Sequence, residues 1–360
     1  MCGRLACTLH ERELRRSCAL ARGHPAKRVR GREDQPRGSN EGKQPAFTND
    51  GDKMSIKIEC EEEDLEPVWI EPEAESLQYK ANHNVTPTQS VPCLMMNEDR
   101  RTVITPMLWG FIPAGHKGTA TNHGLTSFNA RSEGLSASPL YKTAFKSGKR
   151  CAVLCTGYYE WKTIQGRKQP FFFHLPQEED VLVDVNCKEE ENEEFRERRV
   201  TPLAGIYHHW TNSKGEKIPN VTIITMGAGK WVSWCHHRMP VILDTPEKLN
   251  NWLDYDKINA GEAEKMFVEP NVINWYPVRK EFHTSKPELA LKSIKLEECS
   301  LVPEFLSKWE GLESNVKIEP PEIGKYKSTL KRASSPLNDP SSPSKKQTTL
   351  TKWFTKKEPK

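Results

Sequence analysis

Short apolar runs, each bounded by glycine, proline or asparagine, constrain the fold of this chain more than any other feature. The runs are rich in β-branched and aromatic residues, and few helical patterns separate them. Successive parallel strands need a crossover helix, so this pattern favours an α+β fold with a mostly antiparallel β core and helices at its edges. The runs that predict strands are 91–96, 103–110, 151–155, 170–175, 203–207, 221–226 and 240–243.

Three helices are expected beside this core. Residues 1–22 predict a short strand followed by a helix at 11–21. A second helix should start at Thr245-Pro246-Glu247, which supplies a capping hydroxyl, proline at the first helical position and an acid in the first turn. Residues 261–267 predict the third. The second helix should bury Leu249, Trp252 and Leu253.

Composition separates this core from polar segments of the 360-residue chain, whose mean hydropathy is −0.73. Segments 23–66 and 187–199 are charged and lack a periodic apolar pattern, which predicts disordered insertions. The periodic pattern fades beyond residue 282. We therefore expect one folded domain at 2–282 and a disordered tail at 283–360.

The composition also disfavours several classes of protein. No stretch approaches the ~18–20 apolar residues of a membrane span, and no apolar segment of a secretory signal is present near Met1. Ten cysteines at irregular spacing favour a reducing compartment. Zinc is disfavoured because no cysteine pair has the C-x2-C spacing of structural sites. Cys151 and Cys155 lie in an apolar run, where thiols pack as small hydrophobes. We expect no metal and no cofactor.

The second residue is a cysteine, in Met1-Cys2-Gly3-Arg4. Removal of Met1 would leave a free α-amine and a thiol on adjacent carbons. The amine can condense with an aldehyde to an imine, on which the thiol closes a thiazolidine ring. An α-amine titrates near ~7.7–8.0 and a thiol near ~8.5, so both are partly nucleophilic at neutral pH. Alternatively, Cys2 could be an ordinary residue at a frayed end of the chain.

Three polar clusters follow or precede apolar runs, at 127–133, 157–161 and 235–240. They include Glu160 and His236, an acid and a histidine that can donate and accept protons for a nucleophile. Each cluster alone is a weak signal. Glu160 could lie at the rim of the core, His236 could be solvated, and the first cluster could simply hold a loop.

Taken in order, these clusters and the amino terminus resemble the SRAP (SOS-response associated peptidase) family over roughly residues 2–280. The resemblance implies a barrel-like sheet and an activity on abasic sites in single-stranded DNA. The motifs that carry it are Met1-Cys2-Gly3-Arg4, Asn84-Val85-Thr86-Pro87, Trp109-Gly110-Phe111, Asn129-Ala130-Arg131, Tyr158-Tyr159-Glu160-Trp161, Ala204-Gly205-Ile206-Tyr207, Thr222-Ile223-Ile224-Thr225 and His236-His237-Arg238-Met239-Pro240.

The resemblance also implies a mechanism. In this family the initiator methionine is removed, and the new amino-terminal cysteine links covalently to the ring-opened aldehyde of the abasic site. By this resemblance Cys2 is the nucleophile and Glu160 the acid/base. His236 would donate a proton to the deoxyribose ring oxygen, and Asn129 would position the terminus or the sugar.

Further residues would bind DNA by the same resemblance. Arg4 and Arg131 would hold phosphates through their forked donors. Trp109 and Trp161 would stack on unpaired bases, and Thr225 would place a hydroxyl near the site. Asn84, Pro87 and Arg238 complete this DNA-binding set.

Near the end of the chain, the sequence from Gln347 to Phe354 resembles the PIP box that docks on the sliding clamp PCNA. A short helical turn would gather Leu350, Trp353 and Phe354 into one apolar plug while Gln347 fills a polar pocket. The alternative is a chance pair of aromatic residues in a disordered tail.

Other short motifs predict modification and nuclear import. Lys57, Lys295 and Lys317 lie in ψ-K-x-E segments that resemble SUMO acceptor sites. The basic pairs at 331–332 and 345–346 are typical of a split import signal. We expect a monomer in the nucleus, at replication forks, whose partners are abasic single-stranded DNA, PCNA and SUMO.

The sequence therefore predicts an abasic-site sensor that removes its own Met1, crosslinks through Cys2 by thiazolidine and lyase-like chemistry, and shields the lesion. Three other classes remain open. A glutamine amidotransferase can also begin Met-Cys-Gly, but its glutamine-gripping motifs are missing from the sequence. A peptidase would act on other proteins, and a non-covalent reader of modified bases would bind DNA without Cys2.

Overall fold

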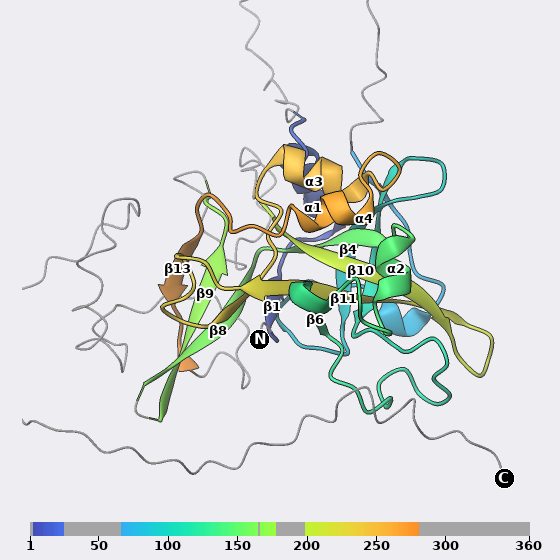
Figure 1. The fold of residues 1–360 in the computed structure, drawn as a ribbon, viewed down its shortest axis with the longest axis horizontal. Helices are drawn as coiled ribbons and strands as arrows, with labels where there is room; N and C mark the ends of the chain where they lie inside the picture. Colours follow the sequence, from blue (N-terminus) through green and yellow to red (C-terminus); the bar gives the residue numbers. More distant parts are fainter. Residues whose placement is uncertain (1–2, 25–65, 165, 178–198, 281–360) are drawn as a thin grey trace, which may run out of the picture. The chain divides into compact units, whose positions relative to one another are not determined.

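The computed structural model describes residues 3–24, 66–164, 166–177 and 199–280 (Figure 1). Cys2 lies outside the described residues. So do almost all of the predicted insertions at 23–66 and 187–199, the tail from residue 283, the PIP-like residues and the three SUMO candidate lysines. The description below concerns the remaining part, which holds the other predicted site residues.

Five strands form a closed barrel. They are β4 (Ser90–Met96), β5 (Thr102–Trp109), β7 (Arg150–Cys155), β10 (Thr201–Thr211) and β11 (Lys217–Gly227). Four antiparallel pairings run β5–β4–β7–β10–β11. A short parallel pairing, Asn220 with Leu108 and Val221 with Trp109, joins β11 to β5 and closes the ring. The expected mostly antiparallel core is confirmed.

Three short strands extend the barrel sheet to eight strands. β2 (Val68–Trp69) runs parallel to β5, and β6 (Asn129–Arg131) runs parallel to β11. β12 (Arg238–Pro240) pairs antiparallel with the end of β11. The ends of β6, β11 and β12 therefore lie together at one rim of the barrel.

A second, antiparallel sheet has the strand order β13–β9–β8–β1–β3. Its strands are β1 (Leu5–Cys7), β3 (Asn82–Val85), β8 (Gly157–Ile164), β9 (Arg167–His174) and β13 (Asn274–Pro277). Only Thr156 separates β7 of the barrel from β8 of this sheet. A Cβ at Gly157 would overlap the Phe172 ring and the Phe173 carbonyl, so this crossing requires glycine.

The helices flank the barrel. α1 (Glu11–Ala21), α3 (Pro246–Leu253) and α4 (Ala260–Glu264) gather on one side in Figure 1, and α2 (Lys142–Lys146) lies nearby. The prediction for α1 is confirmed. α3 starts as expected, with the Thr245 hydroxyl accepting from the Lys248 N–H at 3.2 Å. It buries the three residues predicted for it. α4 ends three residues earlier than expected. Short 3-10 turns are η2 (Glu75–Leu77) and η3 (Ser132–Gly134).

The strand expected at 240–243 is wrong, because β12 ends at Pro240. Beyond it the chain runs between the end of β11 and the start of β10. The Val241 N–H donates to the Ile224 carbonyl of β11, and the Leu243 N–H donates to the Pro202 carbonyl of β10. Val241 and Leu243 are buried in the cluster that includes Leu249 and Trp252 of α3, which explains why the run looks like a buried strand in the sequence.

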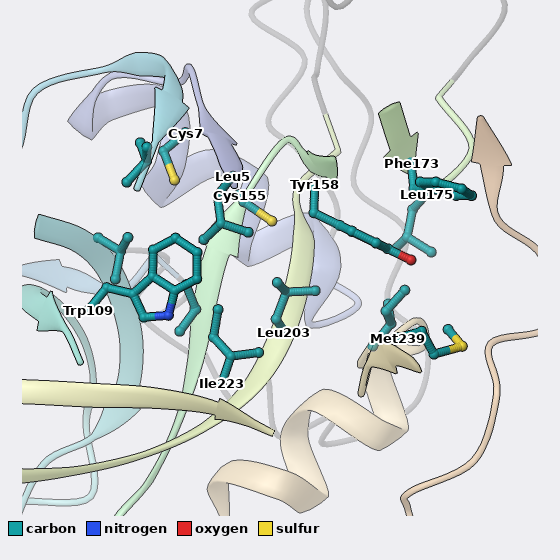
Figure 2. Packing of buried hydrophobic residues seen from close by; sticks show 14 of the residues in the cluster. Leu5, Cys7, Trp109, Cys155, Tyr158, Phe173, Leu175, Leu203, Ile223 and Met239 are labelled. Carbon is teal, nitrogen blue, oxygen red and sulfur yellow. The ribbon is translucent and has the colours of Figure 1, made fainter. Parts of the chain in front are cut away.

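Apolar side chains fill the barrel. Figure 2 shows the Trp109 indole in this core, with Cys155, Leu203 and Ile223. Tyr158 and Phe173 extend the same cluster toward the second sheet. Each fully buried large side chain contributes ~1.5–3 kcal/mol of hydrophobic stabilisation. No helix in the described ranges is long and apolar enough to cross a membrane.

The described cysteines are all buried, as expected for Cys151 and Cys155. Burial raises the pKa of the Cys7 and Cys235 thiols far above their usual range. These thiols are therefore protonated at neutral pH and poor nucleophiles. Within the described ranges, no three His, Cys, Asp or Glu side chains cluster as metal ligands do.

Candidate active site

Glu160 and His236 meet where the two sheets join. Glu160 lies in β8 and is 3% exposed, whereas His236 precedes β12 at the barrel rim. The Glu160 Oε1 and His236 Nδ1 atoms are 3.9 Å apart. This distance is too long for a hydrogen bond but allows an ion pair when the imidazole is protonated. The predicted acid and histidine thus face each other.

Burial raises the pKa of the Glu160 carboxyl to about 7. Removal from water disfavours the charged carboxylate, which is the main cause of such shifts. A group with this pKa is present in both protonation states at neutral pH. It can therefore deliver a proton in one step and accept one in another, as a general acid/base must.

His236 is held by the backbone of the residue two positions further on. Its Nδ1 lies 2.9 Å from the Arg238 carbonyl oxygen and 3.1 Å from the Arg238 N–H nitrogen. Burial lowers the pKa of His236, although its bond to the Arg238 carbonyl acts in the opposite direction. The ring is therefore mostly neutral at pH 7. Protonated Glu160 is the more abundant acid in this pair.

The described chain enters β1 beside Glu160. The Tyr159 N–H donates to the Arg4 carbonyl at 3.0 Å, and Leu5 stands opposite Tyr158 in the β1–β8 ladder. The Arg4 guanidinium donates to the Asn84 side-chain oxygen at 3.1 Å. The sheet order β8–β1–β3 therefore brings together three predicted site residues, Arg4, Asn84 and Glu160, that are 76 or more positions apart in the sequence.

The Arg238 side chain is bonded to two other residues of the protein, Glu133 and Thr225. It is 9% exposed and makes a two-pronged ion pair with Glu133, with 3.0 Å between Nη2 and Oε2. The same Nη2 donates to the Thr225 carbonyl at 2.6 Å. The Arg238 guanidinium lowers the pKa of the Glu133 carboxyl to about 2. We therefore assign Arg238 to tying β12 and β11 to the turn that holds Glu133, in place of the predicted DNA contact.

Two of the residues predicted to contact DNA, Trp109 and Thr225, are buried in this structure. Trp109 is fully buried, and its indole N–H donates to the Phe128 carbonyl at 2.9 Å, so neither ring face is open to a base. Thr225 is also fully buried, and its hydroxyl donates to the Ala130 carbonyl at 3.4 Å. The Trp109 ring packs in the core of the closed barrel, and the Thr225 hydroxyl is covered by Ala130 of β6 and Arg238 of β12.

The other predicted DNA-binding residues are more accessible. Arg131 is exposed at the end of β6, opposite Thr225 of β11, and Asn129 begins the same strand. Trp161 follows Glu160 in β8 and is half-buried. Pro87 is half-buried in the turn after β3. The DNA contacts of these residues stay predictions.

The structure adds residues to which the sequence assigned no role. Glu133 belongs to the cluster at 127–133 that the sequence singled out, but its ion pair with Arg238 was not predicted. Lys162 of β8 donates from Nζ to the Trp234 carbonyl, two residues before His236. The Trp234 ring packs on Trp275, with 4.4 Å between the ring centroids. Lys162 thus ties the strand of Glu160 to the turn that carries His236, and no sequence signal announces this contact.

A comparison of the whole sequence with family models identifies the family of this chain. The model of the family described as SOS response associated peptidase (SRAP) matches residues 1–285. The chain belongs to the SRAP family. This match confirms the resemblance drawn from the motifs and covers both sheets of the fold.

Curated SRAP relatives share the match. The chain is 31% identical over 287 residues to the abasic site processing protein HMCES of Gallus gallus, covering 77% of this chain and 73% of that protein. It is 27% identical to the abasic site processing protein YMR114C of Saccharomyces cerevisiae, covering 66% and 59%. It is 28% identical to the abasic site processing protein YobE of Bacillus subtilis, covering 59% and 86%.

Among solved structures, a crystal structure of a protein from Bacteroides thetaiotaomicron is similar with a TM-score of 0.48 and 22% identity. The match covers 59% of this chain and 85% of that protein.

Proposed function

We propose that this SRAP protein senses abasic sites in single-stranded DNA and crosslinks to them through Cys2 after loss of Met1. The names of its curated relatives support abasic-site processing. The observation that carries the proposal is Glu160, a buried carboxyl with a pKa raised to about 7. It lies 3.9 Å from His236, in the strand that borders the amino-terminal strand.

The reaction would begin with the Cys2 α-amine. The amine attacks the C1′ aldehyde of the ring-opened abasic sugar, and loss of one water gives an imine. The Cys2 thiol then adds to the imine carbon, forming a C–S bond, while its proton passes to nitrogen. The product is a thiazolidine, and the net change is loss of one water. Both groups sit on adjacent carbons, so the ring closes at a high effective concentration.

Glu160 would move protons at two points of this reaction. In its acid form it protonates the departing hydroxyl as the imine forms, and in its carboxylate form it accepts the proton released by the amine. The buried setting makes both forms available near pH 7. His236 would assist opening of the sugar ring, with its ring orientation fixed by the Arg238 backbone.

The same site would remove Met1. Hydrolysis of the Met1–Cys2 peptide bond consumes one water and frees the Cys2 α-amine, and Glu160 as carboxylate can activate that water. This step is consistent with the peptidase in the family's description. Mass spectrometry of a Glu160→Gln variant expressed without a tag tests it, because retained Met1 is the expected result.

The tail would bring this chemistry to replication forks in the nucleus. We include in the proposal PCNA binding through Gln347, Leu350, Trp353 and Phe354, and SUMO attachment at Lys57, Lys295 or Lys317. A pull-down with purified PCNA, comparing the full chain with a Trp353→Ala/Phe354→Ala variant, tests the first of these interactions.

A crosslinking assay tests the central proposal. Purified protein is incubated with a single-stranded oligonucleotide carrying one abasic site, and the adduct is counted on a denaturing gel. Reduction of the abasic aldehyde to an alcohol should abolish the adduct. A heat-stable adduct formed equally by Cys2→Ser would exclude the thiazolidine. Binding without any adduct would favour a non-covalent reader.

A further inference from the structure

A second polar feature lies apart from the Glu160 site. It is an open cavity of about 370 Å³ between the end of α2, the start of β7 and the segment joining α3 to α4. None of the predicted site residues lines it. Its walls are polar and apolar in about equal measure, and Arg150 belongs to its lining. The apolar wall residues are Phe145, Tyr255, Ile258 and Ala260.

Arg150 is buried and only partly hydrogen-bonded. It is 2% exposed, and its Nη2 donates to the Ile258 carbonyl at 2.6 Å. Its Nε and Nη1 have no hydrogen-bond partner among the residues that the structure describes. The guanidinium carbon lies 5.4 Å from the centroid of the Trp252 ring. The charge therefore rests on an aromatic face, while two nitrogens lack an acceptor.

Neighbouring carboxylates are engaged elsewhere. Asp254 accepts from Arg100 at 2.6 Å and pairs with Lys257 at 3.2 Å. Asp256 pairs with Arg100 at 2.8 Å. A buried donor without an acceptor costs ~1–3 kcal/mol, and more when it is charged. The Trp252 ring offsets part of that cost by cation–π attraction, but it supplies no lone pair.

The cavity wall is held in place before any ligand arrives. The Tyr255 side chain packs directly on the backbone of Gly148, where a Cβ would lie 2.7 Å from the Tyr255 Cβ. The Arg100 guanidinium covers the Tyr255 ring at 5.4 Å from its centroid. A wall fixed on two sides keeps the cavity open, which lowers the cost of ordering a bound molecule.

We propose that this cavity binds a small organic oxyanion, with its charged end on Arg150 and an apolar body against Phe145, Tyr255 and Ile258. The forked donors of arginine suit carboxylates and phosphates. The volume is near the lower end of the ~300–1,000 Å³ range of small-molecule sites, and such sites combine apolar side chains with a few polar or charged groups, as this lining does. Lys146 and Asp256 also belong to the lining, and the Asp256 carboxylate is paired with Arg100.

An anion that reaches Arg150 competes with the Ile258 carbonyl for its donors. Binding should therefore perturb the segment 255–260 as well as Arg150. This expectation gives a local readout that general salt effects do not produce.

Amide NMR of the full chain tests the proposal, with sodium benzoate and inorganic phosphate as probes against sodium chloride at equal ionic strength. We expect saturable shifts at Ser147, Gly148 and Ile258. Tighter binding of benzoate identifies a carboxylate with an apolar body, and tighter binding of phosphate identifies a phosphate ester. Absence of saturable shifts with both probes overturns the proposal.

Variants separate the site from non-specific anion binding. Arg150→Met should weaken binding at least tenfold, and Ala260→Phe should do the same by filling the cavity while leaving Arg150 intact. Lys142→Ala, in α2 next to the cavity but outside its lining, should bind like the parent. Equal binding by the parent and Ala260→Phe would refute the site, even if Arg150→Met failed to fold.

Discussion

Two buried charges lie ten residues apart in the run formed by β7 and β8: Arg150 begins β7, and Glu160 lies in the middle of β8. Burial shifts each pKa toward the neutral form, raising that of Glu160 to about 7 and lowering that of Arg150 to about 10. Only the pKa of Glu160 lies close to neutral pH, so only Glu160 is present in both protonation states there. Glu160 is therefore suited to proton transfer, whereas Arg150 stays a permanent cation suited to holding an anion.

The largest expected difference between the Glu160 site and the Arg150 site is in the effect of a substitution on the crosslinking rate. Glu160→Gln should slow adduct formation ~10²–10⁴-fold, the usual contribution of a general acid/base. Arg150→Met should change the rate less than twofold, because Arg150 lies outside the Glu160 site. Single-turnover rates on an abasic oligonucleotide, using protein already freed of Met1, measure both. A comparable loss of crosslinking rate in Glu160→Gln and Arg150→Met would contradict the assignment of proton transfer to Glu160 alone.

The pH dependence of stability should also differ. The folded-state pKa of Glu160, about 7, lies above its ordinary value of 4.5. The folded state thus binds more protons in this window, and its stability falls by about 3 kcal/mol as pH rises from 4.5 to 7. Glu160→Gln should lack this fall and be more stable than the parent at pH 8. Urea unfolding at several pH values checks it.

Arg150 offers the control for that measurement, since its pKa near 10 leaves its charge constant between pH 4 and 8. Arg150→Met should therefore show the parent's slope in this window. A parent slope unchanged in Glu160→Gln would show that another group causes it.

Backbone geometry gives a third, smaller contrast. Gly148 has φ +73° and lies against Tyr255, so Gly148→Ala should destabilise the protein by about 2–3 kcal/mol through backbone strain and overpacking. Gly115→Ala, with open space around it, is the matched control. Crosslinking per folded molecule should stay at the parent rate, because Gly148 lies beside Arg150 and outside the Glu160 site. Loss of rate without loss of stability would contradict this.

The smallest expected effect concerns Lys162, which fixes the turn of His236 to the strand of Glu160. Lys162→Met should slow crosslinking about tenfold by loosening this geometry, with the protein still folded. Lys168→Met on the neighbouring strand β9 should not. The pH–rate profile separates positioning from simple destabilisation, because a displaced His236 should change the apparent pKa near 7. An unaltered profile and rate would remove Lys162 from the account.

Local patterns predicted most elements of the fold. β-branched runs marked β4, β5, β7, β9, β10 and β11, and capping residues marked α3. Closure of the barrel was implied by the family resemblance but not by any local pattern, because it depends on a two-residue parallel pairing between β5 and β11, more than 100 positions apart. That closure also decides the burial of Trp109, which is why an aromatic residue expected to face DNA lies in the core.

The candidate site was predicted more through motif order than through physics. An acid and a histidine at strand ends could be picked out, but their 3.9 Å approach requires the two sheets to meet. The pairing of Arg238 with Glu133 was hidden because nothing local distinguishes an arginine that binds phosphate from one that binds a carboxylate. Arg150 gave no signal in the sequence, because its Nε and Nη1 atoms lose their hydrogen-bond acceptors only when the chain folds and buries them.

Mapping the adduct tests the central claim most directly. The crosslinked complex is digested with protease and nuclease, and the modified peptide is sequenced by mass spectrometry. We predict a modification on Cys2 as the first residue, without Met1, with a mass equal to peptide plus nucleotide remnant minus one water. A modification on any other residue, or an adduct that retains Met1, would contradict the mechanism.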